Sequence, residues 1–235
     1  MNKIYLIFVL LLGLNAPVFG QFPGTPNFFN AGAAVPVSPC GAFVAAGVYK
    51  AFMCHNLGAD TSADPNVPIQ AIFGNYYQWG VKTEVATAYT QGGPISGWNS
   101  NGVAGDPWQD SSKTLDDPCP VNFKVPTKAQ WEGVVSSANN TKSYTGSWSA
   151  DGNFSSAISF GPDASTKTLT LPAAGYRRYD NGALGARNGF GTYWTTTAYP
   201  SNGNNWNFYF DNTSTNFYNS YPRAHGSSLR CISEN

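Results

Sequence analysis

The sequence predicts an α+β fold in which one helix packs on a sheet of short strands. Charged residues make up only 11% of the chain and aromatic residues 15%, and 25 of the 235 residues are glycine. Such a composition is poor in helix formers and rich in the residue types that favour strands and turns. One stretch has a clear helical pattern, whereas several short runs alternate in the manner of strands.

The helix is expected to begin at Thr127. This threonine is a good N-cap, and Gln130 three positions later completes a capping box. Apolar side chains then recur at helical spacing, at Trp131, Val134, Val135 and Ala138. We expect this stripe to pack on a sheet and Asn139-Asn140 to end the helix.

Short strands are expected on both sides of the helix. Residues rich in β-branched and aromatic types, or in alternation, lie at 48–53, 168–171, 193–199, 206–211 and 229–232. In 206–211, alternation predicts that Trp206, Phe208 and Phe210 face the core, and that Asn207, Tyr209 and Asp211 face solvent. The stretch 84–110 has no sustained period and is predicted to be a long loop.

The N-terminus has the pattern of an export signal. A charged start precedes an apolar run from Ile4 to Leu14, which small residues follow up to Gly20. This run is shorter than a membrane-spanning helix, so we interpret residues 1–20 as a secretory signal peptide. A buried N-terminal helix fits poorly because Pro17 and Gly20 end the run. Residues 21–47 are expected to form a Gly/Pro/Ala-rich lead-in, and residues 48–235 a single domain, since neither a repeat nor a linker divides them.

The charge balance argues against polyanionic partners. Lysine plus arginine equals aspartate plus glutamate, 13 of each, and neither sign clusters. We therefore expect no nucleic-acid partner and, after signal cleavage, no membrane insertion. Arg177 and Arg178 could bind an anion, but we interpret them as a solvated pair.

No constellation of catalytic or metal-binding residues stands out, so we expect neither enzyme activity nor a cofactor. His55 and His225 lack the spacing of a zinc site and are expected in loops or on the surface. Aspartates that could supply calcium with oxygen ligands lack an ordered spacing; they are Asp106, Asp110, Asp116 and Asp117. The four cysteines are expected to form two disulfides, and three pairings are possible. Cys40 and Cys54 would close a short loop if paired.

The last fifth of the chain, residues 188–235, has the composition of a binding surface. Tyr, Trp and Phe are interleaved there with Asn, Ser, Thr and Gly, and charge is nearly absent. Antibody paratopes favour these types because aromatic rings are large and rigid and small polar groups adapt their hydrogen bonds. The candidate ligand-binding residues are Tyr199, Asn202, Asn204, Asn205, Asn207, Tyr209, Asp211, Asn216, Tyr218, Asn219, Tyr221 and Arg223. The sequence does not identify the ligand, which we expect to be a protein or a glycan.

An ordered set of motifs resembles one known family. The motifs are Phe52–Asp60, Tyr77–Gly80, Asp117–Pro120, Lys124–Trp131, Leu171–Tyr176, Tyr193-Trp194 and Leu229–Cys231. Together they resemble the Fibrobacter succinogenes major paralogous domain family, and the match covers nearly everything from residue 48 to 231. The resemblance implies a C-type lectin-like fold, related to formylglycine-generating enzymes, with small twisted sheets, one or two helices and long loops. It also implies secretion from bacteria of the Bacteroidetes or Fibrobacteres type and a surface or adhesive role at the cell surface.

The same resemblance implies a disulfide pairing and a variable segment. Cys119 and Cys231 look like the standard pair of the family, which leaves Cys40 and Cys54 as an additional pair. C-type lectin-like proteins diversified by retroelements carry a variable segment near the C-terminus, and the Asn and Tyr positions of residues 199–221 are similar to one. Two alternatives remain: a structural subunit of a surface layer or filament, and an enzyme of the formylglycine-generating type, which would need a reactive cysteine pair.

Overall fold

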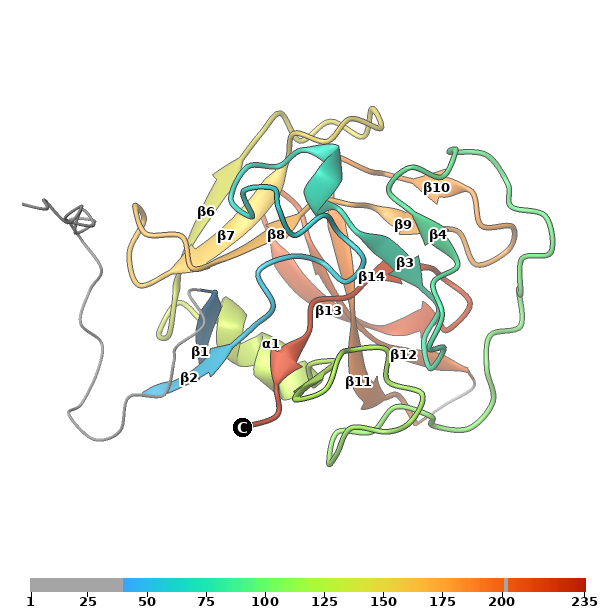
Figure 1. The fold of residues 1–235 in the computed structure, drawn as a ribbon, viewed down its shortest axis with the longest axis horizontal. Helices are drawn as coiled ribbons and strands as arrows, with labels where there is room; N and C mark the ends of the chain where they lie inside the picture. Colours follow the sequence, from blue (N-terminus) through green and yellow to red (C-terminus); the bar gives the residue numbers. More distant parts are fainter. Residues whose placement is uncertain (1–39, 201–202) are drawn as a thin grey trace, which may run out of the picture. The chain divides into compact units, whose positions relative to one another are not determined.

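The computed structural model describes residues 40–200 and 203–235, and it has the expected mixture of small sheets and a helix (Figure 1). The expected signal peptide, residues 1–20, and most of the expected lead-in lie outside the described residues. The helical elements are the α-helix α1 (Lys128–Val135) and the 3-10 turn η1 (Gln70–Ile72). The strands are β1 (Gly41–Ala45), β2 (Val48–Ala51), β3 (Asn75–Tyr77), β4 (Ala86–Thr87), β5 (Phe123–Lys124), β6 (Thr141–Thr145), β7 (Ala157–Gly161), β8 (Leu169–Pro172), β9 (Tyr176–Arg177), β10 (Leu184–Gly185), β11 (Gly191–Ala198), β12 (Asn204–Phe210), β13 (Thr215–Pro222), β14 (Ser227–Ser228) and β15 (Ile232–Ser233).

The largest sheet in the described part of the chain has six strands in the order β13-β12-β11-β14-β3-β4. The pair β11–β14 is parallel, and the other pairs of this sheet are antiparallel. A three-stranded sheet, β6-β7-β8, lies beside it, and three two-stranded sheets complete the fold. The strands expected at 206–211 and 193–199 correspond to β12 and β11, whereas β6, β7 and β13 were not predicted. Of the last expected strand, 229–232, residues 229–231 form the link between β14 and β15, and Ile232 begins β15.

The helix begins as predicted. The hydroxyl of Thr127 accepts the backbone N–H of Gln130, and the Gln130 side chain accepts the backbone N–H of Thr127. The helix ends earlier than its apolar stripe, at Val135. Asn139 and Asn140 donate their side-chain amides to the carbonyls of Gly133 and Val134, so they satisfy acceptors that a longer helix would have paired.

Trp131 places the helix against the large sheet. Its fully buried ring lies 5.4 Å from the ring of Phe52 and 5.2 Å from that of Phe208, and Tyr193 makes an edge contact at 6.1 Å. Figure 1 shows α1 between the β1–β2 hairpin and β11, which are elements that it contacts. The main core therefore lies between α1 and one face of the six-stranded sheet, and it also contains Ile158, Phe160, Leu169 and Leu171 of the three-stranded sheet.

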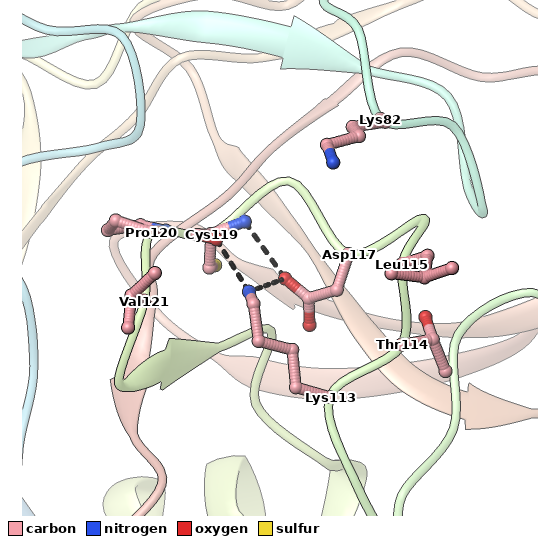
Figure 2. Close-up of a pocket in the computed structure, with 8 residues that line it drawn as sticks. All are labelled: Lys82, Lys113, Thr114, Leu115, Asp117, Cys119, Pro120 and Val121. Atoms are coloured by element: carbon pink, nitrogen blue, oxygen red, sulfur yellow. Dashed lines mark hydrogen bonds and ion pairs between the residues drawn. The ribbon is translucent and has the colours of Figure 1, made fainter.

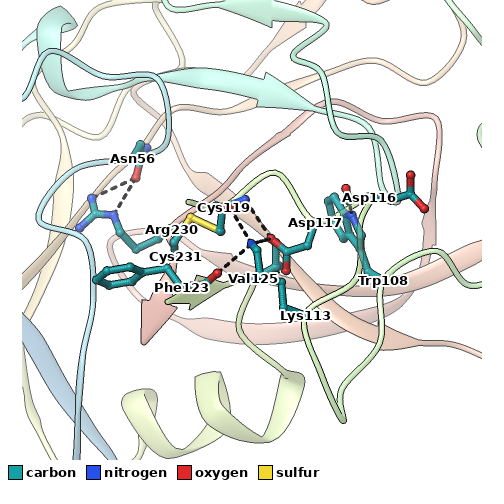
Figure 3. Close-up of a disulfide and its surroundings, with 10 residues drawn as sticks. All are labelled: Asn56, Trp108, Lys113, Asp116, Asp117, Cys119, Phe123, Val125, Arg230 and Cys231. Atoms are coloured by element: carbon teal, nitrogen blue, oxygen red, sulfur yellow. Dashed lines mark hydrogen bonds and ion pairs between the residues drawn. A yellow bond between two sulfur atoms is a disulfide. The ribbon is translucent and has the colours of Figure 1, made fainter. Parts of the chain in front are cut away.

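Arg230 joins three distant parts of the chain inside the protein (Figure 3). Its guanidinium, 1% exposed, donates to the carbonyls of Met53, Cys54 and Thr170 and twice to Oδ1 of Asn56. None of these acceptors is a carboxylate. Burial lowers the pKa of Arg230 to about 10, so the side chain still carries its charge at neutral pH.

Two disulfides close the fold, in the pairing that the family resemblance implies. Cys119 is bonded to Cys231 and Cys40 to Cys54, with sequence separations of 112 and 14. Figure 3 places the Cys119–Cys231 bridge directly beside Arg230. In the chain-entropy account, the longer loop restricts the unfolded chain more, by about 5 kcal/mol against about 3 kcal/mol for the shorter loop.

Replacing Arg230 should destabilise the fold strongly. Arg230→Met keeps a long side chain but removes the hydrogen bonds to three carbonyls and to Oδ1 of Asn56, so we expect a loss of about 3–5 kcal/mol. Urea unfolding followed by tryptophan fluorescence measures this loss. Arg178→Met, at an exposed arginine, is the matched control and should change stability little; equal effects of the two substitutions would contradict the role assigned to Arg230.

Candidate functional site

The candidate site lies on the face of the large sheet that points away from α1, which we call the outer face. Phe208 and Phe210 belong to the main core, and Phe217 packs against it from β13. Because side chains alternate along a strand, Tyr209 and Tyr218 point to the opposite side. One face of the sheet therefore lines the core, and the other is the candidate binding surface.

Six rings form a continuous line on this side of the molecule, which we call the aromatic row. In order they are Tyr218, Tyr209, Phe190, Tyr176, His225 and Tyr179, with successive centroid distances of 5.2, 4.9, 5.7, 5.2 and 5.2 Å. The row starts on β13, crosses β12 and ends beyond β9. Tyr218 and Tyr179 at its two ends are 45% and 46% exposed. Each ring is thus held by its neighbours, while the ends are open to solvent.

A turn aspartate fixes one ring of the row. The hydroxyl of Tyr209 donates to Oδ2 of Asp211 at 3.0 Å, and Asp211 also accepts backbone N–H groups from Thr213 and Ser214. Partial burial alone would raise the pKa of Asp211, but these hydrogen bonds lower it to about 2. Burial and the neighbouring carboxylate both raise the pKa of Tyr209. The phenol therefore stays neutral and the carboxylate charged over the physiological range.

The structure divides the candidate ligand-binding residues into three groups. The exposed members are Asn216, Tyr218 and Asn219. The partly exposed members are Tyr199, Asn204, Tyr209, Asp211 and Tyr221, and the buried members are Asn205, Asn207 and Arg223. Asn202 lies outside the described residues. Asn216, Tyr218 and Asn219 lie on β13 with Tyr209 and Asp211 beside them, whereas Tyr199, Asn204 and Tyr221 lie towards the turn between β11 and β12.

The prediction that Asn207 faces solvent is wrong. Asn207 does lie on the outer face, in register with Trp194 on β11 and Tyr218 on β13, but it is fully buried. Its amide donates a long hydrogen bond of 3.4 Å to the hydroxyl of Ser227. Tyr221 covers this part of the sheet, with its ring 5.3 Å from that of Trp194 and stacked on His225 at 4.2 Å. Trp206, expected in the core, is half-buried instead.

Arg223 holds the long loop in place, and its guanidinium is not free to bind a ligand. Its guanidinium lies over the ring of Trp79 and donates to the carboxylate of Asp106 at 2.8 Å and to the carbonyl of Val103. A further bond goes to Oδ1 of buried Asn205. These contacts attach the region 99–110 to β12 and β13, so Arg223 and Asn205 have a structural role.

Three more residues, His55, His225 and Arg177, are buried although the sequence predicted that they would be exposed or in loops. His55 and His225 are buried, and each bonds a backbone carbonyl, that of Ala63 and that of Arg177 respectively. Arg177 is not solvated: it is fully buried, lies over the ring of Tyr76 and donates to the carbonyls of Thr90 and Gln91. Arg178, its neighbour, is exposed and paired with Asp180.

A hollow of about 550 Å³ lies next to the Cys119–Cys231 bridge (Figure 2). Lys113 points into it, but its ammonium donates to Asp117 at 3.1 Å and to the carbonyls of Cys119 and Phe123, which uses all three protons. Asp117 in turn accepts the backbone N–H groups of Cys119 and Val125. These two charges therefore hold the loop before α1 and are not free to bind a ligand.

The described residues contain no obvious centre for metal or thiol chemistry. No three His, Cys, Asp or Glu side chains within 40–200 and 203–235 come together as metal ligands. All four cysteines of the chain are in disulfides, so a thiol would appear only after reduction. Among the same residues, no helix is long and apolar enough to cross a membrane. Comparison of the chain with protein-family models, with curated proteins and with solved structures returned no match.

The stability of the protein should fall in mild acid because of His225. Burial lowers the pKa of His225 from 6.5 to about 4, with a smaller contribution from Arg178. At pH values between these two pKa values, His225 is protonated in the unfolded chain but neutral in the folded protein. The stabilisation is therefore complete above pH 6.5 and is lost as the pH falls towards 4, by about 3 kcal/mol in total.

Urea unfolding at a series of pH values measures this effect. His225→Phe keeps a ring between its aromatic neighbours but cannot titrate, so the slope between pH 6.5 and pH 4 should disappear. A slope that persists in this variant would assign the titration to another group.

Proposed function

We propose that this protein is a secreted ligand-binding or adhesion protein that recognises its partner with the outer face of β12 and β13. The observation that carries the proposal is the aromatic row, which ends in exposed Tyr218 beside exposed Asn216 and Asn219. Rings that already pack against one another lose little freedom when they bind, so they contribute contact area at low entropic cost.

The rigidity of the scaffold supports this proposal. β12 is paired on both sides, by β11 and by β13, and its inner phenylalanines are fixed in the main core. Side chains on the outer face can therefore differ in identity without disturbing the layer that holds the fold together. This separation of faces suits a protein whose work is recognition and needs no chemistry of its own.

The composition of the surface indicates the class of partner. Around Tyr218 the exposed side chains are amides and hydroxyls, and β13 contains no acidic or basic residue. Such a surface can stack on flat or ring-shaped groups and exchange hydrogen bonds, and the neighbouring carboxylate of Asp211 is already bonded by Tyr209, Thr213 and Ser214. We therefore propose an uncharged glycan or a neutral protein patch at a cell surface as the partner.

The proposal extends to fold family and origin. A C-type lectin-like fold and membership of the Fibrobacter succinogenes major paralogous domain family rest on the ordered sequence motifs, and the Cys119–Cys231 bridge supports both. Two disulfides suit an extracellular protein. If the C-terminal segment is diversified by a retroelement, the variable positions are expected among Asn216, Tyr218 and Asn219, because buried Asn205 and Asn207 are constrained by packing.

Truncation of the exposed ring should weaken binding and leave the fold intact. Tyr218→Ala removes the open end of the aromatic row, and we expect its loss to reduce affinity roughly ten-fold or more. The measurement is binding of the labelled exported chain to a microarray of neutral and charged oligosaccharides and to intact bacterial and animal cells.

Tyr89→Ala is the matched control. Tyr89 is 66% exposed and lies outside the aromatic row, so its truncation should leave binding unchanged. Urea unfolding of both variants separates lost recognition from lost stability. Equal binding by the Tyr218→Ala variant and the unaltered protein would place the binding surface elsewhere.

A further inference from the structure

The strand β13 forms an open edge of the six-stranded sheet. It pairs with β12 on one side, and no backbone hydrogen bond joins Thr215–Tyr221 to any other described element. Alternate residues of an edge strand direct their N–H and C=O groups away from the sheet. Asn216 and residues 218–220 are exposed, so this row of donors and acceptors is accessible.

Several other strand edges in the described part of the chain are protected. β6 carries Lys142 as its second residue and has Lys167 bound to Thr145 at its end, and β2 carries Lys50. The backbone N–H and C=O of Phe43 in β1 are both bonded by the side chain of Asn140. Lysine on an edge strand and a covered backbone are the usual protections against strand pairing.

β13 has neither kind of protection along most of its length. Its sequence, TNFYNSYP, lacks acidic and basic residues. Lysines of other elements contact two of its side chains: Nζ of Lys142 lies 3.4 Å from Oγ1 of Thr215, and the ammonium of Lys128 lies over the ring of Phe217, which also stacks on Phe208 at 5.4 Å. The pairing with β12 is regular over residues 215–218 and has a register shift between Asn205 and Asn207, opposite Tyr221 and Tyr218. A neutral edge that is fixed in this way is a template for another strand.

We propose that the occupant of this edge is β13 of a second copy of the chain, paired antiparallel about a two-fold axis. A neutral edge does not repel itself, and it offers no charge by which a strand of different composition would be preferred. In an isologous pair the same residues lie on both sides, so Asn, Ser and Tyr side chains face one another across the junction. This dimer does not depend on what the outer face binds.

The pairing has a structural consequence. It joins two six-stranded sheets into one continuous sheet, and because the axis is perpendicular to the sheet, both outer faces point in the same direction. Two aromatic rows would then be presented side by side. Any ligand that is repeated on a surface would meet two sites at once, which raises the effective affinity without new contacts.

Charge substitutions at Asn219 test the proposal. The exported chain should show a monomer–dimer equilibrium in sedimentation velocity over a wide range of concentrations. Asn219→Lys and Asn219→Asp each place like charges at the junction and should weaken dimerisation at least roughly ten-fold, whereas an equimolar mixture of the two variants should restore it. Asn212→Lys, in the exposed turn before β13, is the matched control and should dimerise normally.

Hydrogen exchange locates the interface. Backbone amides of residues 215–221 should exchange more slowly as the concentration rises, while other edges stay unchanged. If the Asn219 variants do not fold, Ser220→Lys and Ser220→Asp, at an equally exposed position, serve in their place. A chain that remains monomeric at every concentration, or a dimer that tolerates these charges and leaves the exchange of β13 unaltered, would overturn the proposal.

Discussion

The guanidinium of Arg230 is the interaction on which the rest of the fold depends. It binds the carbonyls of Met53 and Cys54 near the start of the described chain, that of Thr170 in β8, and Asn56, which also accepts the hydroxyl of Tyr193 in β11. A buried cation without a carboxylate is stable only if several oriented dipoles surround it. All these segments must therefore be in place together, and the adjacent Cys231 is bonded to the segment that precedes the helix.

Two other buried arginines bind backbone carbonyls of the loops in the same way. Arg177 binds the carbonyls of Thr90 and Gln91, and Arg223 binds the region 103–106. Loops without regular structure leave many backbone acceptors unpaired, and a buried guanidinium can satisfy several of them at once. These contacts hold parts of the long stretch between β4 and β5 in a protein whose described residues include one short α-helix and small sheets. It also explains why so few charged residues are needed, since the buried ones are each used several times.

The two faces and the edge of the large sheet have different surroundings. The inner face packs against Trp131 and the rest of the main core. The outer face is closed near β14 by Tyr221 and His225 and open near β13, where the aromatic row ends. Recognition and self-pairing would thus both use β13: the ligand contacts its outward side chains, and the second copy pairs with its backbone edge. Because the core lies on the other face, both surfaces can change without loss of the fold.

Local patterns in the sequence determined the features that depend on nearby residues. The capping box of α1, the α+β composition and the burial of Phe208 and Phe210 could all be predicted, since each follows from spacing along one element. The disulfide pairing needed a family resemblance, and the strands β6, β7 and β13 gave no clear alternation. Only the tertiary structure decided that Asn205, Asn207, Arg223 and His225 are buried while Asn216, Tyr218 and Asn219 are exposed. Alternation assigns a side chain to a face of a strand, but the loops and rings that cover that face come from distant parts of the chain, and their position depends on the complete fold.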